Sequence, residues 1–282
     1  MNAIEHPDSA FRNGKLAMLK TDTKTTEVEM VLCRSAIYEA LALAFRPPTD
    51  ETVARLASSE GAGALADAAA VLDAAWGTDL AGLIRRAPAP PRPPSVESLG
   101  SEFRRLFGHT ARGLVPPYET EYGEDSPFLP AQEMSDLAAF FRAFGLLLRP
   151  DAQERIDHIS CAFEFLLFLT RKEAHALEAG QTAMRDDTRM AARLFLRDHL
   201  GRFAPAFGKK LAREHAGGFY GALGELCAAF AAQECARAGV PAGPEFLRLR
   251  SPSDGHAPMA CGTATEPGLL QITGLSSPEP AG

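Results

Sequence analysis

Apolar side chains recur along most of this chain at the three- and four-residue spacing of an α-helix. Ile37, Leu41 and Phe45 form one such stripe, which ends at Pro47 and Pro48. No window alternates apolar and polar residues between the Asn-Gly or Asp-Gly turns that would mark hairpins. The pattern therefore predicts an all-α protein without strands.

Capping residues place the ends of these helices. Thr26 with Glu29 forms a capping-box signature before the first stripe, and Asp151 with Glu154 forms another before a helix that reaches the late 170s. Further helical patterns cover residues 50–86 (two or three short helices), 95–108, 130–148, 186–200, 205–215 and 217–238. Together they predict a single globular helical bundle over residues 26–250.

Three segments lack helical periodicity. Residues 1–25 are polar and irregular, so we expect a flexible N-terminal arm. Residues 87–94, APAPPRPP, are too rich in proline for the interior of a helix or sheet and predict a stiff connector. Residues 251–282 are rich in Pro, Gly, Ser and Thr and predict a disordered C-terminal tail.

The composition narrows the class of protein. A hydrophobic content of 46% with 23% charged residues is typical of a globular protein. The formal net charge of −7 argues against nucleic-acid binding, because a phosphate backbone needs clustered Lys and Arg. No apolar run approaches the roughly 20 residues that cross a bilayer, and the N-terminal segment lacks the apolar core of a secretory signal. We therefore expect a cytoplasmic protein with no membrane insertion.

The segment ERIDHISCAFEFLLFL, residues 154–169, carries the strongest candidate chemistry. On one continuous helix Asp157, Cys161 and Glu164 would share a face, while His158 would point about 100° away from Asp157. This stripe has two interpretations: a metal or acid/base site, or polar side chains that tie neighbouring helices together or bind a partner without catalysis.

Spacing favours the second interpretation. A di-iron bundle needs an inward Glu-x-x-His motif twice, and the chain contains none. It also lacks HExxH, GxSxG, a phosphate-binding loop and a GxGxxG set, and its five cysteines form no CxxC pair. We therefore expect no metal, no cofactor and no enzymatic activity, although an enzyme that uses Asp157, Cys161 and Glu164 stays open as an alternative.

The stretch VPPYETEYG, residues 115–123, predicts an unusual loop. Its prolines restrict the backbone, so Tyr118 and Tyr122 cost less entropy to hold in place. Tyrosine offers an apolar face and a hydroxyl group, as recognition surfaces require, and Glu119 and Glu121 would add negative potential. Alternatively, the tyrosines pack the loop onto its own bundle and the acids are solvated.

Four segments carry a resemblance to a known family. They are YEALALAFRPP from Tyr38, EFRRLF with PPYETEYG, ERIDHISCAFEFL from Glu154, and FLRDHLGRFAPAF with His199. Their order and spacing resemble the TorD family of chaperones for molybdenum-containing redox enzymes, which includes the DmsD and NarJ branches. The chain departs from the pattern at Ile156, where a proline is common, and at Ala162, where a glutamate is common.

The resemblance implies an all-helical chaperone that binds the precursor of the catalytic subunit of a molybdenum-containing oxidoreductase while molybdopterin is inserted. The recognised element would be a twin-arginine signal peptide, or the mature body of a membrane-associated enzyme as in the NarJ branch. A permanent helical subunit of a redox complex is a further alternative. The residues expected to bind the client are Tyr118, Glu119, Tyr122, Asp157, His158 and Glu164; Tyr38 and Phe45 are expected in the core.

Overall fold

The computed structural model describes residues 8–86, 94–108, 112–125, 129–148, 154–251 and 273–274. Of residues 8–25 and 273–274 only the backbone is described. The proline-rich connector predicted at 87–94 and the disordered tail predicted at 251–282 fall almost wholly outside these ranges. The predicted N-terminal arm, 1–25, is described only from Asp8, where the backbone is helical.

Most of the described residues lie in helices, which confirms the all-α prediction. The α-helices are α1 (Asp8–Ala44), α2 (Asp50–Thr52), α3 (Ser59–Trp76), α4 (Leu80–Arg86), α5 (Val96–Phe107), α6 (Leu129–Ala143), α7 (Ile159–Glu178), α8 (Thr182–Phe195), α9 (Gly201–Glu214) and α10 (Phe219–Ala238). Two π-helical turns, η1 (Val53–Ala57) and η3 (Leu196–Leu200), and one 3-10 turn, η2 (Glu119–Glu121), connect or extend them.

One short antiparallel pair was not predicted. Strand β1 (Leu146–Leu147) pairs with β2 (Thr273–Gly274), so that Leu146 lies opposite Gly274. Two residues are too few for an alternating pattern to show in the sequence, because a period of two needs several repeats to be recognised. The pair does not change the helical architecture.

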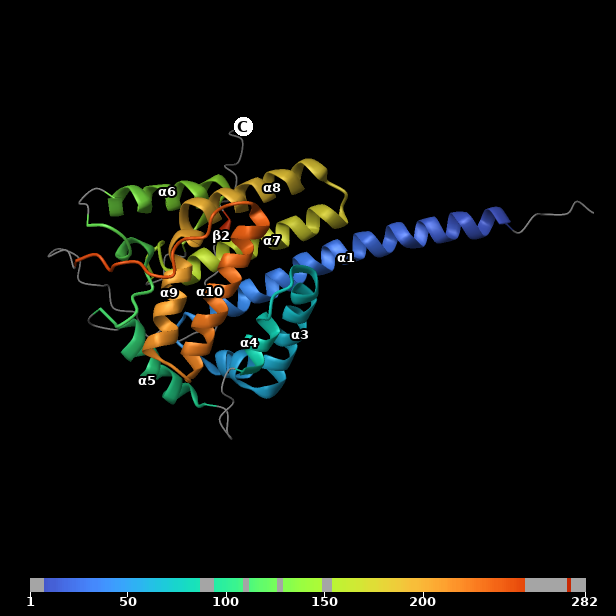
Figure 1. The fold of residues 1–282 in the computed structure, drawn as a ribbon. Coiled ribbons are helices and arrows are strands. Elements are labelled where there is room, and N and C mark those ends of the chain that lie inside the picture. Colours follow the sequence, from blue (N-terminus) through green and yellow to red (C-terminus); the bar gives the residue numbers. More distant parts are fainter. Residues whose placement is uncertain are drawn as a thin grey trace, which may run out of the picture.

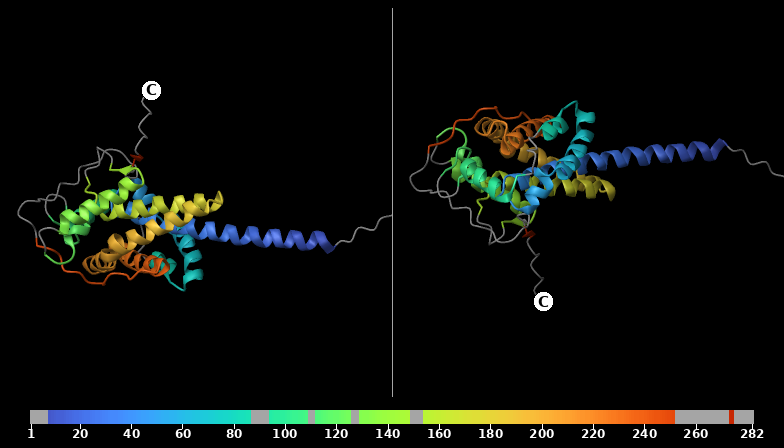
Figure 2. Two further views of the ribbon diagram at one scale, coloured as in Figure 1. Left: turned by 90° about the horizontal axis from the view of Figure 1, so that it is seen from above. Right: turned by 90° about the horizontal axis from the view of Figure 1, so that it is seen from below.

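The helices form a bundle in which α1 lies between two groups of partners (Figures 1 and 2). Helix α1 packs against α7 and α3, α7 packs against α8, and α10 packs against α9 and α4. The N-terminal part of α1 projects from one side of the bundle (Figure 1). None of the helices in the described ranges has the length and apolar character of a membrane span.

Aromatic rings fill the core where α1, α7, α9 and α10 meet. The ring of Tyr38 lies 4.8 Å from that of Phe230, and the ring of Phe45 lies 5.1 Å from that of Phe207 and 6.0 Å from that of Phe163. All five side chains are at most 1% exposed. The sequence prediction that Tyr38 and Phe45 belong to the core is confirmed.

A buried ionic cluster joins α1 to α10 and α7. The guanidinium group of Arg34 donates to both carboxylate oxygens of Glu234, at 2.9 and 2.8 Å, and to Glu173 at 3.0 Å. Tyr38 and Arg237 also donate to Glu234. Burial disfavours the charge of Glu234, but the guanidinium groups of Arg34 and Arg237 outweigh this effect and lower the pKa of Glu234 to about 2.

Two predicted helix starts are wrong. Helix α1 begins at Asp8, so Thr26 and Glu29 lie inside a helix and do not cap one. Helix α7 begins at Ile159 with His158 as its N-cap, because the backbone just before it is bonded elsewhere. The carbonyl of Asp157 accepts from the amide of Glu119 at 2.9 Å. Asp157 therefore precedes the helix and does not share its face with Cys161 and Glu164.

Candidate functional site

Three segments that are distant in sequence meet beside α9. They are residues 112–125, called the loop; residues 154–158, which precede α7; and residues 240–251, which follow α10 and are called the strap (orange-red in Figure 1). An isolated β-bridge joins Tyr118 to His158, and a second one joins Tyr122 to Leu249. The amide of Ile159 also donates to the loop, at 2.8 Å from the carbonyl of Pro117. The loop therefore has a backbone partner on each side.

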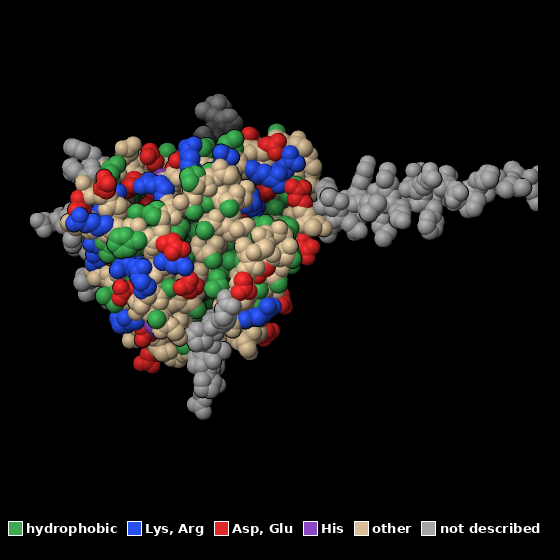
Figure 3. Space-filling model, in the orientation of Figure 1, with side chains coloured by type: hydrophobic (Ala, Val, Ile, Leu, Met, Phe, Trp, Pro, Cys, Tyr) green, Lys and Arg blue, Asp and Glu red, His purple; other side chains and the backbone are tan. Residues whose placement is uncertain are grey.

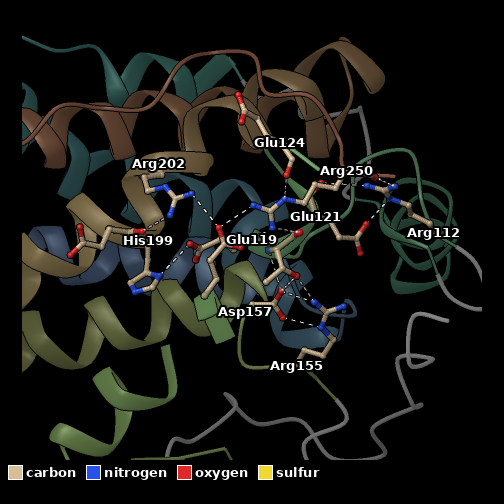
Figure 4. A network of polar contacts seen from close by, with 12 residues as sticks. Arg112, Glu119, Glu121, Glu124, Arg155, Asp157, His199, Arg202 and Arg250 are labelled. Atoms are coloured by element: carbon tan, nitrogen blue, oxygen red, sulfur yellow. Dashed lines mark hydrogen bonds and ion pairs between the residues drawn. The ribbon is translucent and has the colours of Figure 1, made fainter. Parts of the chain in front are cut away.

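Asp157 is the polar centre on the α7 side of the loop (Figure 4). Its carboxylate accepts from the hydroxyl of Thr120 at 2.6 Å and from the amide of Thr120 at 3.3 Å. It also accepts two hydrogen bonds from the guanidinium group of Arg155, at 3.0 and 2.7 Å. Such charge-assisted bonds are the strong ones, and they fix the loop to the start of α7.

The aromatic side chains of the loop pack inward. The guanidinium carbon of Arg155 lies 4.5 Å from the ring centroid of Tyr118, and the ring of His158 lies 5.3 Å from it, edge to face. The hydroxyl of Tyr122 donates to the carbonyl of Pro116 at 2.8 Å, and its ring packs on Phe203 at 5.7 Å. Both tyrosines are at most 7% exposed, so they attach the loop to the bundle.

Glu119 links the loop to the π-helical turn before α9. Its carboxylate lies 3.2 Å from Nδ1 of His199, and both side chains are nearly fully buried. Burial raises the pKa of Glu119, and the interaction with His199 opposes this effect only in part. The ring of His199 in turn packs against Phe140 and Phe195.

Two further carboxylates, those of Glu133 and Glu121, lie on the strap side of the loop, and each pairs with arginine. Glu133, near the start of α6, accepts two hydrogen bonds from the guanidinium group of Arg250, at 2.8 and 3.1 Å, and one from Arg202 at 3.3 Å. Glu121 pairs with Arg112 at 2.5 Å. Burial raises the pKa of Glu121, while Arg112 opposes the rise.

His158 and Glu164 complete the predicted set. Nδ1 of His158 accepts from the amide of Ser160 at 3.2 Å, and burial lowers the pKa of His158, so its imidazole is neutral at pH 7. Glu164, on α7, pairs with Arg46, which follows α1. Glu164 therefore ties α7 to the end of α1, whereas His158 caps α7 beside the loop.

The structure brings five of the six predicted residues into one site and places Glu164 on the adjoining turn of α7. All six are buried; the most exposed, Tyr118, shows 7% of its surface. Sequence reasoning missed Thr120, Arg155, Glu133 and Arg250. Thr120 and Arg155 lie inside the quoted motifs, so their position was a signal, but no local pattern could pair Glu133 with an arginine 117 residues away.

No three His, Cys, Asp or Glu side chains in the described ranges are grouped as metal ligands would be. The polar groups that meet at the site are mainly carboxylates and guanidinium groups around a short stretch of backbone. Such an arrangement suits the binding of a basic, extended chain, because charged hydrogen bonds and backbone pairing both act there.

Comparison with known proteins matches this chain to one family model and to relatives named chaperone protein TorD. The family model described as nitrate reductase delta subunit matches residues 69–209, which include the loop, α7 and His199. Chaperone protein TorD from Vibrio cholerae serotype O1 is 30% identical over 142 residues, which is 48% of this chain and 60% of that relative. Chaperone protein TorD from Photobacterium profundum is 26% identical over 132 residues, 47% of this chain and 60% of the relative. The chain thus spans about three fifths of the length of these relatives, and their name describes a chaperone, not an enzyme.

Proposed function

The chain belongs to the nitrate reductase delta subunit family, in which it resembles chaperones named TorD, and we propose that it is itself a chaperone for a molybdenum-containing oxidoreductase. In this proposal it acts in the cytoplasm and binds the precursor of the catalytic subunit before that subunit is exported or assembled. It supports insertion of the cofactor and performs no chemical step. The element that it recognises is the N-terminal twin-arginine signal peptide.

One observation carries the proposal: three of the four segments that bear the family resemblance converge on a single site, while the first, from Tyr38, lies in the core. The loop, the start of α7 and His199 all lie in the region matched by the family model, and they meet through Asp157, Glu119 and Tyr118. Segments separated by 35 to 80 residues are thus joined at one place. A set of motifs that only stabilised separate helices would not need to meet in this way.

The site offers the groups that a signal peptide needs. Such a peptide has a basic segment followed by an apolar segment. Glu119, Glu121 and Asp157 supply carboxylates for arginine, and Tyr118 and Tyr122 supply rings on which an arginine or an apolar side chain can pack. Because Tyr118, Glu119, Tyr122, Asp157, His158 and Glu164 are buried, the client reaches them only if part of the site opens.

The face shown in Figure 3 adds an argument from charge. Lys and Arg are interspersed there with Asp and Glu, and hydrophobic side chains lie between them. On this face neither sign of charge prevails, so its field gives a basic peptide little steering there, although the net charge of the chain is −7. Carboxylates at defined positions, as the site provides, would then supply the specific contacts.

Calorimetric titration tests the proposal. The purified full-length chain is titrated with the N-terminal peptides of every molybdoenzyme catalytic subunit encoded in the same genome, and with matched peptides whose paired arginines are replaced by glutamine. We expect saturable binding of one peptide and loss of that binding when its arginines are replaced. If no peptide binds, recognition of a signal peptide is refuted for this chain.

The description of the matching family favours a second candidate. The matching family model is described as nitrate reductase delta subunit, and the NarJ branch, which the sequence also resembles, would recognise the mature body of its client. In that case the chain would bind the catalytic subunit from which the N-terminal peptide has been removed. Titration with this truncated subunit separates the two modes of recognition.

A further inference from the structure

The strap places an arginine side chain deep inside the site. Arg250 is 7% exposed, and its guanidinium group donates to both carboxylate oxygens of Glu133. The same group donates to the carbonyl of Thr120 at 2.8 Å and to that of Glu124 at 2.9 Å (Figure 4). A planar carboxylate and two carbonyls thus surround the guanidinium fork, and this set of acceptors is named the arginine pocket below. Its geometry fits the fork of arginine better than the single ammonium group of lysine.

The backbone of the strap pairs with the loop beside this pocket. The amide of Gly123 donates to the carbonyl of Arg248 at 2.9 Å, and the amide of Arg250 donates to the carbonyl of Glu121 at 2.9 Å. Gly123 has φ of +111°, and a Cβ atom there would lie 3.3 Å from the guanidinium group of Arg250. The strap thus adds to the loop as a short antiparallel strand, which is how extended peptides add to an exposed edge.

Beyond these contacts the strap lies on the surface. Phe246 is 70% exposed, and Arg248 is exposed as well. Upstream, the amide of Gly243 donates to the carbonyl of Gly201 at 2.8 Å, close to the start of α9. The strap therefore has the character of a bound peptide: an extended basic and apolar segment, FLRLR. It is held by backbone pairing, by the buried side chain of Arg250, by Leu247 and Leu249, which pack against the core, and by the hydrogen bonds from Ser251 to Asp125.

Three carboxylates of the site, those of Asp157, Glu121 and Glu133, already have an arginine of this chain beside them, and Glu119 has His199. Asp157 pairs with Arg155 and Glu121 pairs with Arg112. Arg112 is part of the loop and Arg155 directly precedes α7, so both belong to the site itself. Arg250 differs, because it enters from a separate surface segment.

We propose that the strap is an internal ligand. The pocket around Glu133 is a binding site for an extended peptide that carries an arginine, and Arg250 occupies it until such a peptide displaces the strap. The inference rests on the proposed function, since the displacing peptide is the client's. In this role the strap competes with the client. The site then opens only to a client that carries an arginine for the pocket and an extended segment whose backbone can pair with the loop.

The test uses Arg250→Gln in the full-length chain, which removes the charge and the fork but retains a polar side chain. The matched control is Arg248→Gln, an equal loss of charge two residues earlier on the exposed face of the strap. A third variant, Arg250→Lys, keeps the charge without the fork. Folding of each variant is checked by circular dichroism.

Two probes are titrated: the client's N-terminal peptide, and the synthetic peptide GPEFLRLRS, which copies residues 243–251.

We expect Arg250→Gln to bind the client peptide about tenfold more tightly than the wild type, because a charge-assisted competitor has been weakened. Arg250→Lys should lie between the two, and Arg248→Gln should match the wild type. In the wild type, hydrogen exchange at the amides of Gly123 and Arg250 should change when the client peptide binds, and this measurement needs no variant.

The outcomes separate this inference from the proposed function. Equal or weaker binding of the client peptide by Arg250→Gln, with the strap amides still protected, overturns the internal ligand and leaves the proposed function in place. If no client peptide binds but GPEFLRLRS binds Arg250→Gln and not the wild type, the site exists and signal-peptide recognition fails. If GPEFLRLRS binds neither protein, the inference is overturned directly.

Discussion

The buried cluster at Glu234 gives a quantitative prediction. Glu234 is fully buried on α10, where it accepts hydrogen bonds from Arg34, Tyr38 and Arg237. Glu234→Gln keeps the shape of the side chain but removes its charge, so the guanidinium group of Arg34 loses one of its two carboxylate partners. The substitution should therefore weaken the attachment of α1 to α10, through which the signature residue Tyr38 is held in the core.

The size of the effect follows from the pKa of Glu234, which is lowered from 4.5 to about 2. At about 1.4 kcal/mol per pH unit, this difference amounts to about 3 kcal/mol of stability. Loss of one partner of a buried ion pair costs about 3–5 kcal/mol, which agrees. Since the folded state lowers the pKa, the contribution is complete above pH 4.5 and is lost as the pH falls toward 2.

Urea unfolding followed by circular dichroism measures this contribution. At pH 7 we expect Glu234→Gln to be about 3 kcal/mol less stable than the wild type, and at pH 3.5 we expect the difference to shrink to about 2 kcal/mol. The control is Glu225→Gln on the same helix, whose 43%-exposed side chain pairs with Lys209 at 3.2 Å and should contribute under about 1 kcal/mol. A difference below 1 kcal/mol at pH 7, or one that does not change with pH, would refute the reasoning.

Three further predictions concern single side chains. Asp157→Ala removes the side-chain hydrogen bonds between Asp157, Thr120 and Arg155 and leaves the backbone bonds between the loop and the start of α7 in place. It should cost about 3 kcal/mol in the same unfolding assay, whereas Asp136→Ala at an exposed position should change stability by less than about 0.5 kcal/mol. Equal losses would contradict the role of the network. Gly208→Ala places a Cβ atom about 2.4 Å from a carbonyl oxygen of α10 and should lower the free energy of unfolding by about 1–3 kcal/mol. In the control, Gly100→Ala, the nearest atom to the new Cβ is 3.4 Å away, so this substitution should be neutral or stabilising. A tolerated Gly208→Ala would show that α9 and α10 can separate. Burial raises the pKa of Cys161 to about 12, so its thiol should resist a thiol reagent at pH 8 in the folded protein and react rapidly in urea. Labelling is assigned to each cysteine by peptide mass spectrometry, because Cys33 is only half-buried. Rapid labelling of Cys161 in the folded chain would mean that the start of α7 opens.

The helical pattern was sufficient to predict the fold class and much of the core, because burial imposes a period that is visible in a single sequence. It was not sufficient to place helix ends. The capping signature at Thr26 was wrong because the helical backbone continues back to Asp8. The start of α7 was misplaced because Asp157 is bonded to the loop, a contact between segments 37 residues apart that no local pattern reports.

The candidate site was predicted in part. The residues of the two motifs proved to be neighbours, since Tyr118 lies against His158 and Asp157 binds the loop. The motifs did not reveal that these side chains are buried, because burial depends on which segments cover them. The strap is one such segment, and its arginine pairs with a glutamate on α6 that had no distinguishing feature in the sequence.

The central claim is that the chain is a chaperone which binds an immature client, and a comparison of client forms tests it most directly. The tagged full-length chain is mixed with the cofactor-free precursor of the client catalytic subunit and, separately, with the finished cofactor-loaded enzyme. We predict a stoichiometric complex with the precursor and none with the finished enzyme. A stable complex with the finished enzyme would identify a permanent subunit instead, and binding to neither form would contradict the account.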